Sequence, residues 1–265
     1  MKLFACMCNQ PQRLAAALTP VRAALVAEPP VARWGLAYSQ GGDVLLVRTP
    51  KASTRPVDLA SPLTEIATDC AIAAAVRGTE SAPGGTDNTP PFRFRRWMFA
   101  QGATANLEAA TPRLLEHVPE YLRRNLKGRT PSELLFHLFL AMLHDEGSVD
   151  DPNLPAQATR RALAATIKLA TTEQQRAATT SDAVVLGNIA VSNGRSMVVA
   201  RLGEPLRLRR LWVTNERGER DESFRGVLLL SGGDGDARDG FEDVPAQRAV
   251  LIGRDLQVSL ADLAP

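Results

Sequence analysis

The helix that begins near Thr130 constrains the fold of this chain more than any other segment. Thr130, Pro131 and Glu133 supply an N-cap, a first-turn proline and the acidic member of a capping box. The residues that follow, 134–143, are apolar on almost every side of the predicted helix. A helix at a protein surface keeps one polar face, so we expect this one to lie between other layers of structure.

Short strands precede and follow this helix. The apolar run at residues 3–8 ends at Asn9-Gln10-Pro11, which is typical of a buried strand. Runs at 34–38 and 43–47 flank a glycine turn and predict a hairpin. Further strands are predicted at residues 71–76, 92–100, 183–186, 189–191, 197–201, 211–214, 226–230 and 250–252. The alanines of 71–76 leave a helix open there, because alanine is a poor strand former.

The order of these elements indicates the architecture. Helices are also predicted at residues 12–26 and 157–175, so the chain runs from strands through two long helices to strands again. This order favours an α+β fold over alternating βαβ units. We expect a four-layer αββα sandwich, with two mainly antiparallel sheets between helical layers, and one domain over residues 1–265.

Composition limits the kinds of molecule that this protein is expected to bind. The 31 basic and 29 acidic residues leave a formal charge of +2, too little for the broad positive field that nucleic acids or membrane surfaces require. Three cysteines do not make a disulfide framework and suit a reducing cytoplasm. No run of about 18 apolar residues is present, so no membrane span is expected.

Few residues suggest chemistry by themselves. His117, His137 and His144 fall in helical segments at spacings unsuited to a shared metal, so neither a metal nor a cofactor is expected. Cys6 and Cys8 would face the same side of a strand, as buried thiols rather than a redox or metal pair. The basic and aromatic stretch 92–97 could stack nucleic-acid bases, but a strand with one solvated arginine face explains it better. The arginines at 207, 209 and 210 have the same interpretation.

Seven segments together resemble one known family. The segments are 3–5, Leu-Phe-Ala; 34–37, Trp-Gly-Leu-Ala; 74–77, Ala-Ala-Val-Arg; 88–92, Asn-Thr-Pro-Pro-Phe; 97–102, Trp-Met-Phe-Ala-Gln-Gly; 128–133, Gly-Arg-Thr-Pro-Ser-Glu; and 188–194, Asn-Ile-Ala-Val-Ser-Asn-Gly. In this order they resemble the class II glutamine amidotransferases, the N-terminal-nucleophile family that includes stand-alone bacterial members. The resemblance spans most of the chain and implies their fold.

The sequence departs from the family pattern at the positions that carry out the family's chemistry. The resemblance puts Met1 where the family has its nucleophilic cysteine, and a thioether has no proton to lose. Gly102 and Ala103 stand where the family has the Asn-Gly pair of its oxyanion hole. Other polar family residues are replaced by Ala75, Gln101 and Pro131.

The resemblance leaves one substrate contact in place. Arg77 matches the family's arginine for the glutamine α-carboxylate, and its alternative role is that of an exposed arginine at a strand end. Arg77, Trp34 and Gln101 are therefore the predicted ligand-binding residues. We expect a pseudoenzyme without glutaminase activity that binds another protein, and a small carboxylate near Arg77. The alternative is an active amidohydrolase that uses Cys6 or Cys8 after processing, although Met1 should be retained because Lys2 is large.

Overall fold

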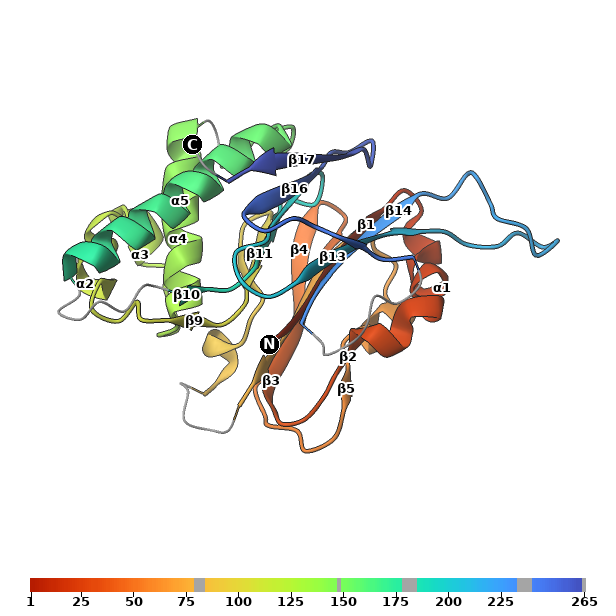
Figure 1. Cartoon of the computed structure of the whole chain (residues 1–265), viewed down its shortest axis with the longest axis horizontal. Coiled ribbons are helices and arrows are strands. Elements are labelled where there is room, and N and C mark those ends of the chain that lie inside the picture. The colour runs from red at the N-terminus through yellow and green to blue at the C-terminus, as the bar shows by residue number, and fades with distance from the viewer. Residues whose placement is uncertain (79–83, 147–148, 178–184, 233–239, 264–265) are drawn as a thin grey trace.

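Two antiparallel sheets stacked face to face form the centre of the protein (Figure 1). The computed structural model describes residues 1–78, 84–146, 149–177, 185–232 and 240–263. The seven-stranded sheet has the order β15-β13-β14-β1-β6-β3-β4, and the six-stranded sheet has the order β17-β16-β12-β11-β8-β7. Two short pairs, β2 with β5 and β9 with β10, lie outside them.

The strands of the two sheets come from both halves of the chain. The first sheet contains β1 (Lys2–Cys8), β3 (Val31–Gln40), β4 (Asp43–Thr49), β6 (Cys70–Arg77), β13 (Leu206–Leu211), β14 (Gly226–Ser231) and β15 (Glu242–Asp243). The second contains β7 (Phe92–Phe94), β8 (Trp97–Gln101), β11 (Ile189–Ser192), β12 (Met197–Ala200), β16 (Arg248–Ile252) and β17 (Val258–Asp262). The short pairs are β2 (Val26–Ala27) with β5 (Val57–Asp58), and β9 (Thr104–Ala105) with β10 (Val185–Leu186).

Helices cover the two outer faces. The second sheet is covered by α4 (Pro131–Glu146) and α5 (Ala156–Ala177), next to α2 (Thr111–Glu116) and α3 (Glu120–Arg123). The first sheet is covered by α1 (Leu14–Leu18) and the 3₁₀ helices η1 (Pro11–Arg13), η2 (Thr19–Leu25) and η3 (Ser61–Thr64). A further 3₁₀ turn, η4, spans Thr86–Asn88. The predicted αββα sandwich is therefore confirmed, with α4 and α1 on opposite sides of the sheets in Figure 1.

Strand β1 shows how the layers are held together. Its alternate residues Leu3, Ala5 and Met7 pack into the core between the sheets. The residues between them pack against the α1 side. Because both faces are covered, six consecutive residues of this strand are buried, as the uninterrupted apolar run predicts.

Local signals predicted several elements and missed others. The capping helix and the β3–β4 hairpin form as expected, and the turn of the hairpin uses Gly41 and Gly42 at positive φ. Residues 71–76 form a strand, which settles the alternative left open there. The predicted helix 12–26 is broken into α1 and two 3₁₀ helices, because Pro20 has no N–H to continue an α-helix.

Two strand predictions need correction, and other strands were missed or lie partly outside the described residues. The segment 92–100 is two strands, β7 and β8, because the chain turns at Arg95, whose φ is 51°. The strand predicted at 211–214 lies earlier, as β13, and β17 was not predicted. Residues 183 and 184 of another predicted strand lie outside the described residues.

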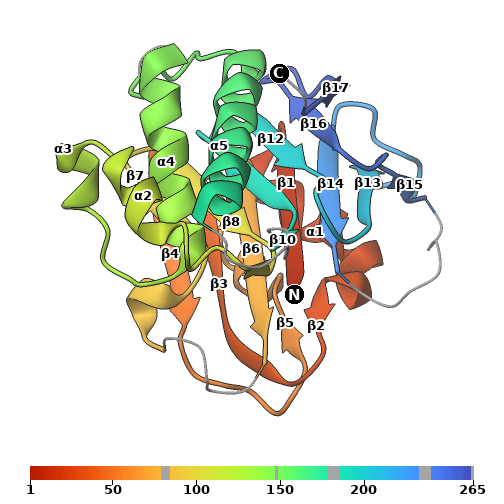
Figure 2. The same ribbon diagram turned by 60° about the vertical axis from the view of Figure 1, so that its left-hand side comes forward.

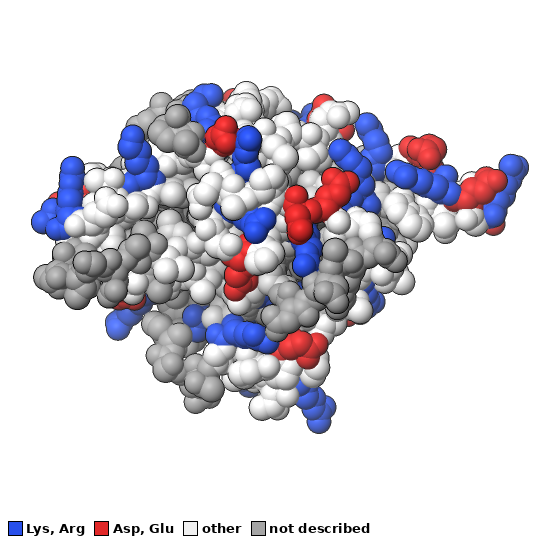
Figure 3. Space-filling view, viewed as in Figure 1, with Lys and Arg blue, Asp and Glu red and all other residues white. Residues whose placement is uncertain are grey.

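The visible surface carries both signs of charge. In the space-filling view, Lys and Arg side chains alternate with Asp and Glu side chains on this face, and no broad patch has a single sign (Figure 3). This distribution agrees with the small net charge. In the described parts of the chain, no helix is both long and apolar enough to cross a membrane.

Candidate functional site

A cavity of about 450 Å³ lies where β1 begins. The ends of β1, β6 and β14 lie next to one another in the middle of the first sheet (Figure 2). Residues at these strand ends line the cavity. The η2 helix and the segment after it form one wall. The residues used below that line this cavity, which we call the Met1 cavity, are Met1, Ala75, Arg77, Glu204, Arg207 and Gly232.

Met1 is held in place by its surroundings. Its α-amino nitrogen lies 3.6 Å from Oε1 of Glu204, and its side chain is only 6% exposed. Gly232, at a φ of 80°, packs so closely that a Cβ atom there would lie 2.0 Å from the carbonyl oxygen of Met1. Only glycine fits at position 232, and Met1, directly before β1, therefore has a fixed position next to the cavity.

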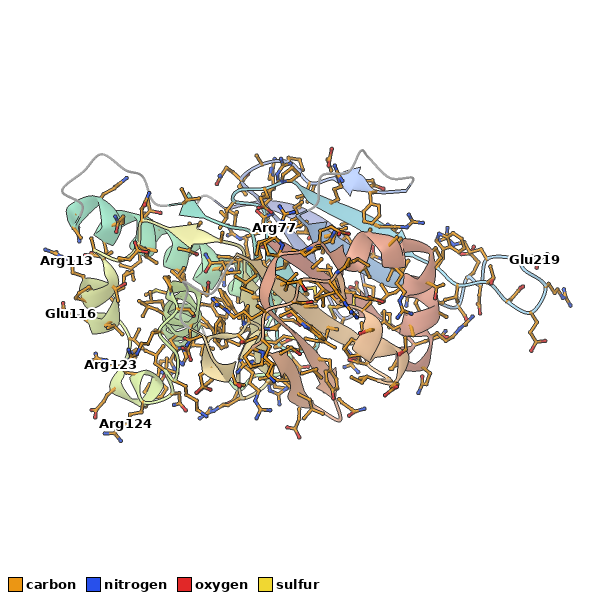
Figure 4. All side chains as sticks on the ribbon, turned by 90° about the horizontal axis from the view of Figure 1, so that it is seen from below. Arg77, Arg113, Glu116, Arg123, Arg124 and Glu219 are labelled. Carbon is orange, nitrogen blue, oxygen red and sulfur yellow. The ribbon has the colours of Figure 1, made fainter. Side chains whose placement is uncertain are left out.

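Two arginines contribute positive charge to the Met1 cavity. Arg77 ends β6, is exposed, and has no hydrogen-bond or ion-pair partner among the described residues (Figure 4). Arg207 extends from β13, and its Nε lies 3.4 Å from Oδ1 of Asp243. A small carboxylate that enters the cavity would therefore meet a guanidinium group whose donors are not used inside the protein.

The structure brings some of the predicted site residues together and separates others. Ala75 lines the Met1 cavity because β6 pairs with β1, opposite Lys2. Trp34 lies in β3 and pairs with Ala75 of β6. Its half-buried ring, however, packs against the core between the first sheet and α1. Pro131 is the first residue of α4 and does not line the cavity.

Gln101 and Gly102 lie at the end of β8 in the second sheet. By strand alternation, Gln101 shares the helix-facing side of β8 with Trp97 and Phe99. It is 1% exposed, and neither oxygen nor nitrogen of its amide has a partner among the described residues. Gly102 has a steric role, because a Cβ atom there would lie 2.9 Å from Cα of Gly187. Neither residue lines the Met1 cavity.

Asn188 is a residue whose importance the sequence did not reveal. It is 2% exposed, and its side-chain nitrogen donates to Glu204 O and Ser231 Oγ, both at 2.8 Å. Its side-chain oxygen accepts from the N–H groups of Leu202 and Gly203 at 2.8 and 3.0 Å. Asn188 thus links the second sheet to the loop that carries Glu204 beside Met1. Its only sequence signal was its place at the start of a strand-turn motif.

The cysteines are placed as structural residues. Cys6 is fully buried in the middle of β1, with strands paired on both sides, and burial raises the pKa of its thiol well above the usual range. Burial likewise raises the pKa of Cys8 and of Cys70 to about 12. Neutral thiols are poor nucleophiles, and cleavage before Cys6 would remove half of a central strand.

No group of three or more metal-ligating side chains occurs in the described part of the chain. His117 lies 4.0 Å from Glu173, His144 stacks edge-on with Tyr121, and His137 is buried in α4. The three histidines are therefore apart from one another and outside the Met1 cavity.

Comparison with solved structures identifies the fold. A glutamine aminotransferase class-II domain protein from Silicibacter pomeroyi matches over 100% of both chains, at 18% identity and a TM-score of 0.60. A predicted glutamine amidotransferase from Pseudomonas aeruginosa matches over 97% of this chain and 98% of its own, at 14% identity and a TM-score of 0.59.

A third match is a domain of a longer protein. The glutamine phosphoribosylpyrophosphate amidotransferase of B. subtilis, complexed with ADP and GMP, is matched over 100% of this chain but 49% of its own, at 12% identity and a TM-score of 0.55. No protein-family model and no curated protein matches the chain by sequence. At these identities the comparisons establish the fold alone, which is that of the class II glutamine amidotransferases.

Proposed function

We propose that this chain, which has the class II glutamine amidotransferase fold, does not hydrolyse glutamine and binds a small carboxylate in the Met1 cavity. The observation that carries the proposal is the side chain at the start of β1. Met1 lies at the cavity where the family resemblance puts a nucleophilic cysteine. A thioether has no proton to give up and cannot form the acyl intermediate of a covalent mechanism.

Other features of the site support the loss of activity. The α-amino group, to which the resemblance gives the role of general base, forms an ion pair with the carboxylate of Glu204. Ala75 supplies no polar group to the cavity. Gly102, which stands where the resemblance expects the side-chain donor of the oxyanion hole, lies outside the Met1 cavity and has no side-chain amide. Loss of one such donor lowers the rate about a hundredfold or more.

We further propose that the protein acts in the cytoplasm as a binding or regulatory partner of another protein. A long connection between β13 and β14 extends away from the body of the molecule in Figure 1. Its stem carries Trp212, which is 36% exposed, and Glu219 lies near its tip, far from Arg77 in Figure 4. A projecting hairpin with an exposed tryptophan suits a contact with a second protein.

The alternative, an active amidohydrolase with a cysteine exposed by processing, finds less support. It requires Cys6 or Cys8 to leave the middle of a sheet, where both are buried and hydrogen-bonded through the backbone. Intact mass spectrometry of the purified protein separates the two proposals. A mass that includes Met1 excludes the alternative, and a mass that begins at Cys6 or Cys8 excludes the pseudoenzyme.

Two measurements test the pseudoenzyme proposal. Ammonia and glutamate release from glutamine should stay at background, while titration with glutamate should detect binding that Arg77→Gln weakens at least tenfold. Arg113→Gln is the matched control, because Arg113 is exposed on α2 and far from the cavity (Figure 4). Steady turnover of glutamine by the intact protein would overturn the loss of activity. Equal glutamate binding by the Arg77 and Arg113 variants would overturn the carboxylate site.

A further inference from the structure

A second cavity, of about 960 Å³, lies at the β4 edge of the first sheet. Strand β4 forms one side, the β7–β8 hairpin another, and the segment after α3 together with α4 closes it. Figure 2 shows β4, β7 and α3 close together, on the other side of β3 and β6 from the N-terminus. Strands β6 and β3 separate β4 from β1, so this cavity, which we call the His137 cavity, is distinct from the Met1 cavity.

A buried polar atom in its wall lacks a partner. His137 lines the cavity and is 3% exposed. Its Nδ1 lies 2.9 Å from the backbone oxygen of Glu133, which can only accept, so Nδ1 carries the proton and donates. Nε2 is then an acceptor, and it is buried without any hydrogen-bond partner among the described residues. Burial lowers the pKa of His137, which is consistent with a neutral ring. A ligand that donates a hydrogen bond would satisfy this atom.

Cationic side chains in the same cavity have hydrogen-bond donors that are not used by the described residues. Arg93 donates from Nη1 to the backbone oxygen of Val44 and keeps its other N–H groups. The side chains of Arg96 and Lys127 have no hydrogen-bond or ion-pair partner among the described residues. Each could bind a phosphate or carboxylate oxygen.

Two of the four described acids that line the cavity have partners. The buried carboxylate of Glu133 accepts from the backbone N–H groups of Lys127 and Gly128 at 3.0 and 2.7 Å. Asp150 is paired with Arg95. Asp43 and Asp87 are exposed to water, where their charges are screened. The cavity therefore presents the buried, unpartnered Nε2 of His137, together with exposed or half-exposed arginine and lysine side chains that have unused donors.

We propose that the His137 cavity binds a small organic anion that carries a phosphate or carboxylate group and a separate hydroxyl group. The anionic group binds Arg93, Arg96 and Lys127, and the hydroxyl donates to Nε2 of His137. Inorganic phosphate satisfies only the first half of this site. The site is independent of the Met1 cavity and requires no catalysis.

Calorimetric titrations with glycerol 3-phosphate, glycerate and inorganic phosphate test this proposal. We expect at least one of the two hydroxylated anions to bind the intact protein at least tenfold more tightly than inorganic phosphate. His137→Phe, which keeps a ring of similar size and removes the acceptor, should abolish that difference. Arg96→Gln should weaken all three ligands at least threefold, and Arg124→Gln on the surface beside α3 should change none.

Nitrogen NMR of the wild-type protein gives a readout that does not depend on the folding of a variant. Binding of the hydroxylated anion should move the Nε2 resonance of His137 to the lower frequency of a hydrogen-bonded acceptor, and inorganic phosphate should leave it in place. The proposal is wrong if none of the three anions binds at millimolar concentration. It is also wrong if the Nε2 resonance is unmoved at saturation with the hydroxylated anion.

Discussion

At the scale of single residues, close approach explains several positions that a sequence comparison would assign to lost chemistry. Gly102 replaces a polar family residue, yet it is also where two segments of backbone come nearest. A Cβ atom on Gly187 would lie 2.5 Å from the Cα atom of Gly102. The absence of a side chain here is therefore a packing requirement.

Gly187→Ala should destabilise the protein by about 1–3 kcal/mol, because the added methyl group forces β8 and the start of β11 apart. Chemical denaturation followed by circular dichroism measures the change. Gly84→Ala is the matched control, since a Cβ atom there meets nothing within 4 Å. Its free energy of unfolding should stay within about 0.5 kcal/mol of the wild type. Equal stability of the two variants would refute the packing argument.

His137 should make stability depend on pH. Burial lowers its pKa in the folded state, so the unfolded chain binds a proton first as the pH falls from about 7 to 5. The free energy of unfolding should therefore decrease on acidification, by up to about 1.4 kcal/mol per pH unit from this residue. His137→Phe should show a shallower decrease. Parallel curves for wild type and His137→Phe would contradict this assignment.

At the scale of elements, Glu133 at the start of α4 belongs to the predicted capping box and also holds the loop before the helix. The N–H of Glu133 lies 3.3 Å from Oγ1 of Thr130, which is half of the predicted capping box. The carboxylate does not return to the backbone of Thr130. It accepts instead from Lys127 and Gly128, and so it fixes the loop that enters the helix.

Glu133→Gln should cost about 1–3 kcal/mol, because the amide offers one acceptor oxygen where the carboxylate offers two, and a backbone N–H loses its partner. Urea denaturation measures the loss. Glu116→Gln, at an exposed position of α2, should change stability by less than about 0.5 kcal/mol (Figure 4). A stability equal to that of the Glu116 variant would show that the loop does not depend on the carboxylate.

Elements specified by local signals could be predicted, and those specified by distant pairing could not. The cap of α4 and the glycine turn of the β3–β4 hairpin are each formed by residues close together in the sequence, so both can be recognised there. The bounds of β13 are set by its pairing with β14, in which Leu206 lies opposite Ser231. The arginines between its leucines make the apolar and polar alternation of this strand hard to recognise in the sequence.

Some positions of the candidate site could likewise be predicted from the sequence, and others could not. Met1, Ala75 and Arg77 were predicted as site residues and do share a cavity, because β1 and β6 are neighbours in the sheet. Gln101 faces the helices, a consequence of strand alternation and sheet stacking that a motif cannot reveal. The bonds of Asn188 reach residues 14 to 43 positions away, so local sequence gives no sign of them.

At the scale of the whole molecule, the connection between β13 and β14 is separable from the four layers. Its base is tied to the body by Arg13, which pairs with Asp221 at 2.6 Å and lies over the ring of Phe224. Beyond the bridge between Thr214 and Arg220, the hydrogen bonds of the tip are local, around Asn215. The tip is thus free to contact a second protein without disturbing the core.

Replacement of residues 215–219 by Asn-Gly should leave the stability within about 0.5 kcal/mol of the wild type, because a two-residue turn can close the strands at the Thr214–Arg220 bridge. Thermal unfolding by calorimetry measures this. Arg13→Ala should lower the melting temperature, since it removes the tie at the base. A marked loss of stability in the shortened protein would show that the tip is part of the folded core.

The position of β1 in its sheet also bears on how the protein is made. One neighbour, β6, lies at residues 70–77, and the other, β14, lies at residues 226–231. During synthesis, β1 must therefore wait until residues 226–231 have been made before its second edge is paired. Such long-range pairing makes folding slow and leaves an apolar edge open to aggregation in the meantime. Nascent chains that end before residue 226 should consequently depend on chaperones far more than the finished protein.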